Sequence, residues 1–156
     1  MEKLLLPLLA MLAVSGTALA SSAANERAAL RICAKATKNI NLLADFTRTD
    51  CTPAKEAQRH SLIFVSLDPI FANPKSKKAY LIVLVGAVGA ELNSSSAARI
   101  ENINIMDKEL GRQRTYFTIP ARDAARLQED IRTDRIDLEG FYRGILSAGK
   151  VRAVAK

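Results

Sequence analysis

The sequence predicts a single, mostly helical α+β domain, with one β-hairpin between N-terminal and C-terminal helices. Three observations lead to this prediction. The first residues have the layout of an export signal, and apolar side chains then recur every three or four residues through much of the chain. The stretch after Ala98 instead alternates apolar and polar residues, as strands do. Helices, a hairpin and further helices in this order are typical of an α+β domain.

The N-terminal residues match a signal peptide. Lys3 provides a positive n-region, Leu4–Val14 an apolar segment, and the tripeptide ALA at 18–20 the small-x-small form that signal peptidase cleaves. An uncleaved membrane anchor is the alternative, but about 11 apolar residues at ~1.5 Å each span roughly half of a bilayer core. We therefore expect residues 1–20 to be removed and residues 21–156 to form one domain. The expected location is the periplasm if the source is a Gram-negative bacterium, or the medium if the protein is secreted.

The segment after the signal carries a helical pattern. From Asn25 to Phe46 apolar residues follow one another at steps of three and four, which indicates one buried helix face. Thr52 and Pro53 then resemble the start of a second helix. The run Leu62–Leu67 fits either that helix or a short buried strand, and periodicity does not separate the two. We favour the helix.

The most apolar stretch of the mature chain runs from Ala79 to Ala90, and its length bears on whether it spans a membrane. A helix of about 12 residues is ~18 Å long, well short of a bilayer core. Asn73 and Pro74 suit a helix cap and first turn, although abundant β-branched residues leave a strand as the alternative. We expect a helix buried on nearly all sides and no membrane span in the mature chain. Gly86 and Gly89, with the adjoining Ala90, would let another backbone approach closely.

The second half of the chain begins with a predicted hairpin over residues 100–119. Ile103 and Ile105 alternate with asparagines, and after a turn that contains glycine Phe117 and Ile119 alternate with threonine.

Two helices follow this hairpin. Pro120 opens the first of them, and Asp137 suits the N-cap of the second, which ends near Gly149. The terminal KVRAVA is expected to add a short strand.

Two cysteines in an exported chain predict a bridge between Cys33 and Cys51. Closing a loop of this size contributes about 3 kcal/mol in the chain-entropy model. A helix that ran on to Asp45 would carry the chain ~18 Å from Cys33 and leave only a nearly straight return. The bridge therefore predicts that the helix ends early, near Asn39 or Asn41. Two unpaired thiols are the alternative.

Catalytic and metal-binding patterns are not found in the sequence. His60 is the single histidine, the two cysteines do not have a zinc or redox spacing, and nucleotide-binding and hydrolase motifs are missing. The carboxylates between Glu129 and Glu139 are interleaved with arginines, which indicates a solvated helix surface rather than an acid and base pair. We therefore expect no catalytic residues, no metal and no cofactor.

The net charge of +7 favours anionic surroundings, although nucleic acid is not an expected partner of an exported protein. Basic residues in three segments would form an anion-binding surface if the segments met in space: NPKSKK, GRQR and KVRAVAK. The candidate anion-binding residues are Lys75, Lys77, Lys78, Arg112 and Arg114. Separate solvated segments are the alternative.

These observations predict an exported, non-enzymatic envelope accessory or protein-interaction module. The alternative function is peripheral binding to anionic envelope polymers or lipids through the basic segments. An envelope hydrolase is a third class, because its carboxylates need no sequence motif.

Overall fold

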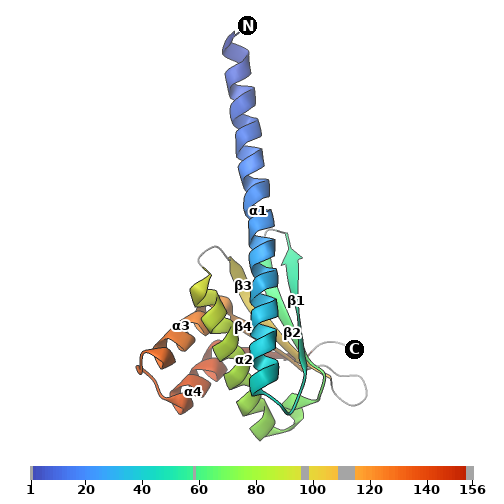
Figure 1. The fold of residues 1–156 in the computed structure, drawn as a ribbon, viewed down its shortest axis with the longest axis vertical. Helices are drawn as coiled ribbons and strands as arrows, with labels where there is room; N and C mark the ends of the chain where they lie inside the picture. The colour runs from blue at the N-terminus through green and yellow to red at the C-terminus, as the bar shows by residue number, and fades with distance from the viewer. Residues whose placement is uncertain (1, 58, 96–98, 109–114, 154–156) are drawn as a thin grey trace.

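The chain folds into four α-helices and a five-stranded sheet, as the computed structural model shows (Figure 1). It describes residues 2–57, 59–95, 99–108 and 115–153, with the backbone alone for residues 2–21, 115, 152 and 153. The elements are α1 (Glu2–Leu43), β1 (Thr49–Glu56), β2 (Arg59–Ser66), the 3-10 helix η1 (Ile70–Ala72), α2 (Pro74–Ser94), β3 (Ile100–Asp107), β4 (Thr115–Pro120), α3 (Ala121–Arg132), α4 (Leu138–Ala148) and β5 (Lys150–Ala153). This content confirms the predicted α+β class.

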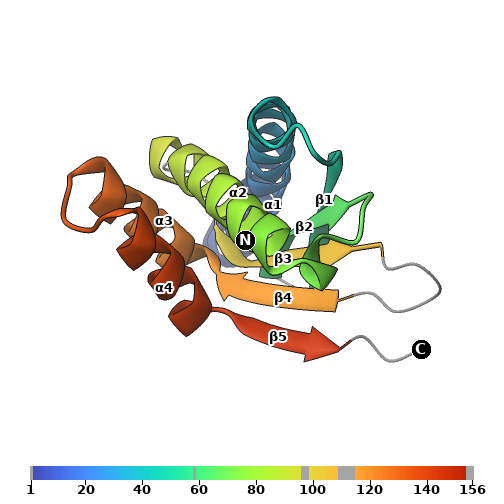
Figure 2. The same cartoon turned by 90° about the horizontal axis from the view of Figure 1, so that it is seen from below.

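The strands lie in the sheet in the order in which they occur in the chain, β1-β2-β3-β4-β5. β2 and β3 are parallel, so the chain must cross over between them, and α2 makes that connection. The other three pairs are antiparallel. The four helices lie on one side of the sheet, and the opposite side has none of them over it (Figure 2). The fold therefore has two layers.

The expected helix over residues 52–67 is wrong, because this segment forms β1 and β2, joined as an antiparallel pair. In β2 burial alternates from residue to residue, with Leu62 and Phe64 fully buried and Ile63 half-buried. Both faces of the strand thus carry apolar residues, which hides the period of two in the sequence. Pro53 is compatible with β1 because β1 is an edge strand, where a missing N–H is tolerated.

Helix α1 is hydrogen bonded to the sheet region at two places, near the start and near the end of the part whose side chains are described. Asn25 accepts a hydrogen bond from Arg99 N (2.7 Å) and donates to Arg99 O (3.1 Å). Asn41 does the same with Thr49, at 2.8 and 3.0 Å. Each amide therefore satisfies both backbone groups of a residue just before or at the start of a strand. This pairing fixes which side of the helix faces the sheet.

The N-terminal half of α1 extends away from the sheet (Figure 1). Its backbone is helical from Glu2 to Leu43 and is therefore continuous through Ala20, the expected cleavage point. Among the described residues, no helix combines the length and the apolar character needed to cross a membrane.

The apolar run Ala79–Ala90 lies within α2, as predicted, and within this run only its first and last residues are exposed. Asn73 caps the helix by accepting hydrogen bonds from the N–H groups of Lys75 (2.9 Å) and Ser76 (3.3 Å). The predicted close approach occurs at Gly89, where an added Cβ would lie 2.6 Å from Ala124 O of α3. Gly86, in contrast, faces open space.

The predicted hairpin is confirmed as β3 and β4, and both later helices form where expected. Pro120 precedes α3 and occupies its N-cap position, so the first helical residue is Ala121. Asp137 caps α4 by accepting a hydrogen bond from Gly140 N (2.7 Å), and Gly149 follows its last turn. The terminal strand β5 pairs with β4 and completes the sheet.

Candidate functional site

The candidate site is the side of the sheet that has no helix over it. Every second side chain of β2, β3 and β4 faces this side, since the residues between them are buried under the helices. We call this set the uncovered face: Ser61, Ile63, Val65, Asn102, Asn104, Met106, Tyr116, Thr118 and Pro120. All nine are half-buried by their neighbours rather than fully exposed.

One half of the uncovered face is apolar. Val65, Met106 and Tyr116 are successive partners across β2, β3 and β4, and Ile63 lies two residues from Val65 on the same side. Their side chains form a continuous apolar row on a sheet surface that faces solvent. Methionine and tyrosine in such a position are typical of the central part of a protein interface.

The other half of the uncovered face is polar and hollowed. A depression of about 370 Å³ is lined by side chains from all five strands, among them Glu56, Ser61, Asn102, Asn104, Thr118 and Lys150. The volume lies within the range of small-ligand sites, which begins near 300 Å³. Tyr116 borders both halves and lines the depression as well.

The polar groups of the depression are largely available for a partner. Thr118 Oγ1 donates to Asn104 Oδ1 at 3.1 Å. Within the described part of the chain, Ser61 and Asn102 make no side-chain hydrogen bond. Their hydroxyl and amide groups could therefore donate to or accept from a bound molecule. Among the described lining residues Glu56 is the single carboxylate, which does not supply the two carboxylates that glycan hydrolysis needs.

The predicted disulfide is present. Cys33 on α1 and Cys51 on β1 are bonded, with their Cα atoms 5.4 Å apart. The expected early end of the helix is wrong, because α1 continues to Leu43. The return is nonetheless short enough, since a strand rises about 3.3 Å per residue and a helix about 1.5 Å. Fewer residues of β1 therefore suffice to come back alongside Cys33.

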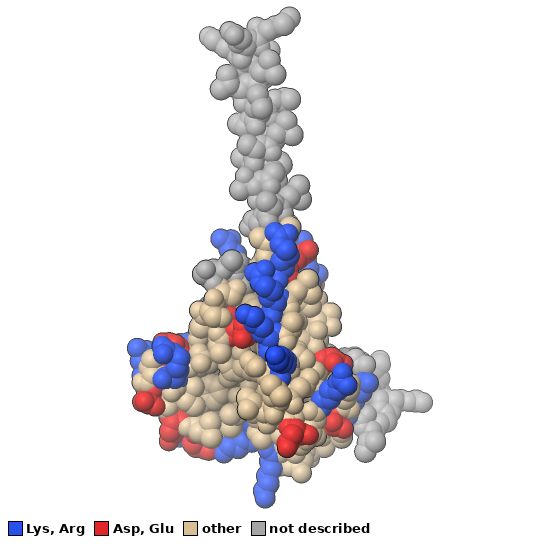
Figure 3. Space-filling view, in the orientation of Figure 1, with Lys and Arg blue, Asp and Glu red and all other residues tan. Residues whose placement is uncertain are grey.

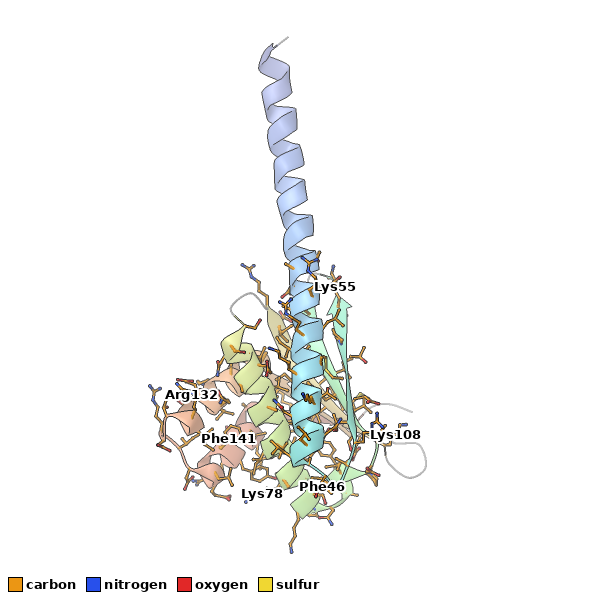
Figure 4. All side chains as sticks on the ribbon, viewed as in Figure 1. Phe46, Lys55, Lys78, Lys108, Arg132 and Phe141 are labelled. Atoms are coloured by element: carbon orange, nitrogen blue, oxygen red, sulfur yellow. A yellow bond between two sulfur atoms is a disulfide. The ribbon has the colours of Figure 1, made fainter. Side chains whose placement is uncertain are left out.

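The predicted basic surface is only partly within the described residues. Lys75, Lys77 and Lys78 lie within the first two turns of α2, and Lys78 is at the same end of the molecule as Phe46 (Figure 4). Lys78 Nζ already pairs with Glu139 at 2.6 Å and lies 5.1 Å from the centre of the Tyr142 ring. Arg112 and Arg114 lie outside the described residues. The anion-binding role of these five residues stays a prediction.

Two carboxylates of the C-terminal cluster, Glu129 and Asp130, form ion pairs with neighbouring arginines, as the mixed charge of this segment indicates. Arg132 Nε donates to Glu129 at 2.9 Å, and this hydrogen bond lowers the pKa of the Glu129 carboxyl. Asp130 accepts a hydrogen bond from Arg135 Nη1 at 3.4 Å and forms an ion pair with Arg126 at 3.7 Å. Positive and negative side chains stand side by side in this region (Figure 3).

His60 and a set of hydroxyl groups lie on the helix-covered side instead. His60 is only 4% exposed at the start of β2. Tyr80 of α2 and Thr49 of β1 share a hydrogen bond of 2.7 Å, and burial raises the pKa of the Tyr80 phenol, an effect that Asp107 reinforces and the Thr49 hydrogen bond opposes. Asp107 itself accepts from Phe71 N at 2.7 Å. These contacts tie α2 and η1 to the ends of the strands and serve the fold.

The uncovered face was not predicted from the sequence. Its nine residues and those that line the depression come from strands up to about 90 positions apart, from Glu56 to Lys150, and only the strand order brings them together. The alternation of asparagine with isoleucine in β3 was the one available signal, because a strand with one polar side leaves that side facing solvent.

Comparison of the chain with protein-family models, with curated proteins and with solved structures finds no match.

Proposed function

We propose that the chain is an exported, non-enzymatic binding module that docks a protein partner on the uncovered face of its sheet. The observation that carries this proposal is the apolar row Val65–Met106–Tyr116 beside a polar depression, on a face that the helices leave open. Interfaces between proteins commonly combine such an apolar centre with polar groups around it.

The disulfide supports the exported location. Bridges such as Cys33–Cys51 persist in oxidising compartments and are rare in the cytosol. Together with the signal-like residues 1–20, this favours the periplasm or secretion. We expect to recover the protein from the periplasm or the medium. Its intact mass should equal that of a chain that begins at Ser21. Recovery from the cytosol with residues 1–20 attached would contradict export.

A photo-crosslinking amino acid at Met106 tests the docking face in living cells. Met106 lies at the centre of the apolar row, so a bound partner would lie against it. We expect a discrete covalent adduct from this position. The matched control is the same amino acid at Arg143, which is exposed on α4 and lies on the helix side.

A second variant makes this test specific. Val65→Asp places a charge next to the crosslinking position and should abolish the adduct while an unchanged urea midpoint shows that the fold is intact. Adducts of equal yield from Met106 and Arg143, or no adduct from Met106, would overturn the proposal.

The alternative of peripheral binding through Lys75, Lys77 and Lys78 has weaker support, because Lys78 is already paired with Glu139. A hydrolase has weaker support still, since the depression offers the single carboxylate of Glu56 among its described lining residues.

A further inference from the structure

Four cationic side chains form a line along the exposed side of α1. Arg27, Arg31, Lys35 and Lys38 are separated by four, four and three residues, and all four are exposed. Residues at these spacings lie above one another on a helix. Figure 3 shows the resulting column of blue side chains over α1. We call these four residues the cationic stripe.

The cationic stripe has no internal counter-charge. Within the described residues none of its four members forms an ion pair, whereas Glu26, beside Arg27, is paired with Lys55 of β1. Like charges at i and i+4 destabilise a helix, so the stripe does not serve the stability of α1. It spans about 16 Å, roughly two Debye lengths at physiological salt, and can attract an extended anionic surface over its whole length.

The orientation of the stripe is fixed by the fold. Asn25 and Asn41 bind backbone groups on either side of it, and the Cys33–Cys51 bridge lies between them. The opposite side of the helix is consequently held against the sheet, and the stripe cannot turn inward to find a partner within the domain.

Apolar side chains lie on the same exposed side. Leu30 is 57% and Leu42 is 70% exposed, and both are within a helical turn of a stripe residue. A helix with cations and exposed leucines on one side is suited to the interface of a bilayer, where phosphates and acyl chains are both within reach. A soluble polyanion would satisfy the charges alone. Asp45, which is exposed just after the helix, opposes contact at that end, so the attraction comes from the stripe.

We propose that the cationic stripe docks this domain on the surface of an anionic phospholipid bilayer, with lipid phosphates bound by the four cations and Leu30 and Leu42 reaching the acyl boundary. The contact is peripheral and crosses no membrane. Because α1 lies on the helix side of the sheet, this orientation leaves the uncovered face pointing away from the lipid (Figure 2). The proposal does not depend on the protein partner.

Vesicle sedimentation of the exported protein tests the docking. One vesicle type contains phosphatidylglycerol and phosphatidylcholine, and the other contains phosphatidylcholine alone. Each cation near an anionic surface contributes about a fivefold gain in partition. Replacing all four with glutamine (Arg27, Arg31, Lys35 and Lys38) should therefore lower binding to the anionic vesicles by at least about 100-fold. Salt near 1 M, where the Debye length is about 3 Å, should release the unmodified protein.

The matched control removes the same charge elsewhere. It carries glutamine at four other exposed cations that have no ion pair within the described residues: Arg99, Arg122, Arg143 and Lys108. This variant should retain most of its binding to the anionic vesicles. An equal loss in both quadruple variants would show that net charge alone governs binding and would overturn the proposal, as would equal binding to pure phosphatidylcholine.

A third comparison separates a bilayer from a soluble polyanion. Leu30→Ser combined with Leu42→Ser should weaken binding to the anionic vesicles several-fold and leave binding to long-chain polyphosphate unchanged. If the double variant binds the vesicles as well as the unmodified protein does, the leucines do not reach lipid and the bilayer is the wrong partner. Urea midpoints of the variants, expected to be unchanged, show that each remains folded.

Discussion

The two faces of the sheet differ in what their side chains contact. Along β2, Leu62 and Phe64 point under the helices and are completely buried, while Ile63 and Val65, their neighbours in the chain, point outward and stay half-exposed. One strand thus contributes to the core on one side and to the candidate docking surface on the other. A one-residue slip in register would exchange the two sets, so the apolar residues of the buried face hold the outer surface in place.

The polar groups of the two faces differ as well. On the covered side the Thr49 and Tyr80 hydroxyls, and those of Thr47 and Ser66, are hydrogen bonded to each other, both pairs at 2.7 Å. On the uncovered face Asn102 makes no side-chain hydrogen bond within the described residues. Buried polar groups need internal partners, whereas groups on the open face are left for solvent or for another molecule. The covered side thus satisfies its polar groups internally, and the open side carries the groups that the proposed docking would use.

Truncation of a side chain on each face should give the largest contrast. Phe64→Ala removes a fully buried ring and should lower the free energy of unfolding by about 3–5 kcal/mol. Val65→Ala, one residue further and on the open face, should cost about 1 kcal/mol or less. Urea unfolding of the two variants measures both. Equal losses would mean that the open face is buried in solution and that the comparison is wrong.

The disulfide strengthens the covered side by joining α1 to β1. Replacing both Cys33 and Cys51 with alanine should lower the free energy of unfolding by about 3 kcal/mol, since the unfolded chain regains the freedom of an 18-residue loop. The same measurement under strong reductant is the control, because the unmodified protein then loses its bridge and should approach the variant. Equal stability without reductant would contradict this expectation.

Much of the covered side could be predicted from the sequence. The apolar run of α2, the caps at Asn73 and Asp137 and the alternation in β3 are local signals, and the structure confirms each of them. β1 was missed because Thr52 and Pro53 resemble a helix start, and β2 could not be assigned, because the residues from Leu62 to Val65 are apolar on both faces. Local periodicity is uninformative for such a strand, and only its pairing with β3 settles the matter.

The candidate sites differ in how far the sequence could have revealed them. The uncovered face joins β2, β3 and β4, and its depression is lined from all five strands, an order that no local pattern encodes. The cationic stripe, in contrast, is contained in a single helix, and the spacing of Arg27, Arg31, Lys35 and Lys38 was present in the sequence.

On the covered side, the close packing of α2 against α3 can be tested at two glycines of α2. Gly89→Ala adds a Cβ 2.6 Å from Ala124 O and Gln128 Cβ of α3, so the helices must move apart, at a cost of about 1–3 kcal/mol. Gly86→Ala enters open space and should stabilise the helix by up to about 1 kcal/mol. Thermal or urea unfolding of the two variants measures whether each substitution raises or lowers the free energy of unfolding. A stabilising Gly89→Ala would show that α2 and α3 are not in close contact in solution.

The smallest expected effect concerns the buried hydroxyl pair and is best seen at alkaline pH. Burial raises the pKa of Tyr80 above its ordinary value of 10.0, so above about pH 10 the folded protein retains a proton that the unfolded chain has lost. This contribution to stability is complete below pH 10 and falls as the pH rises further. Tyr80→Phe should cost about 1 kcal/mol at pH 7, through the lost hydrogen bond to Thr49.

The difference between the unmodified protein and Tyr80→Phe should then shrink by about 1 kcal/mol per pH unit above pH 10, because the phenylalanine variant has no proton to lose at this position. Other alkaline groups are present in both proteins, so their effects cancel in the difference. Thr49→Val is the matched control: it removes the same hydrogen bond and keeps the phenol, and it should therefore retain the alkaline decline. Urea unfolding at several pH values between 7 and 11 measures all three proteins. A difference between the unmodified protein and Tyr80→Phe that stays constant across this range would show that the Tyr80 hydroxyl is accessible to water, and that the covered side is less tightly closed than its packing indicates.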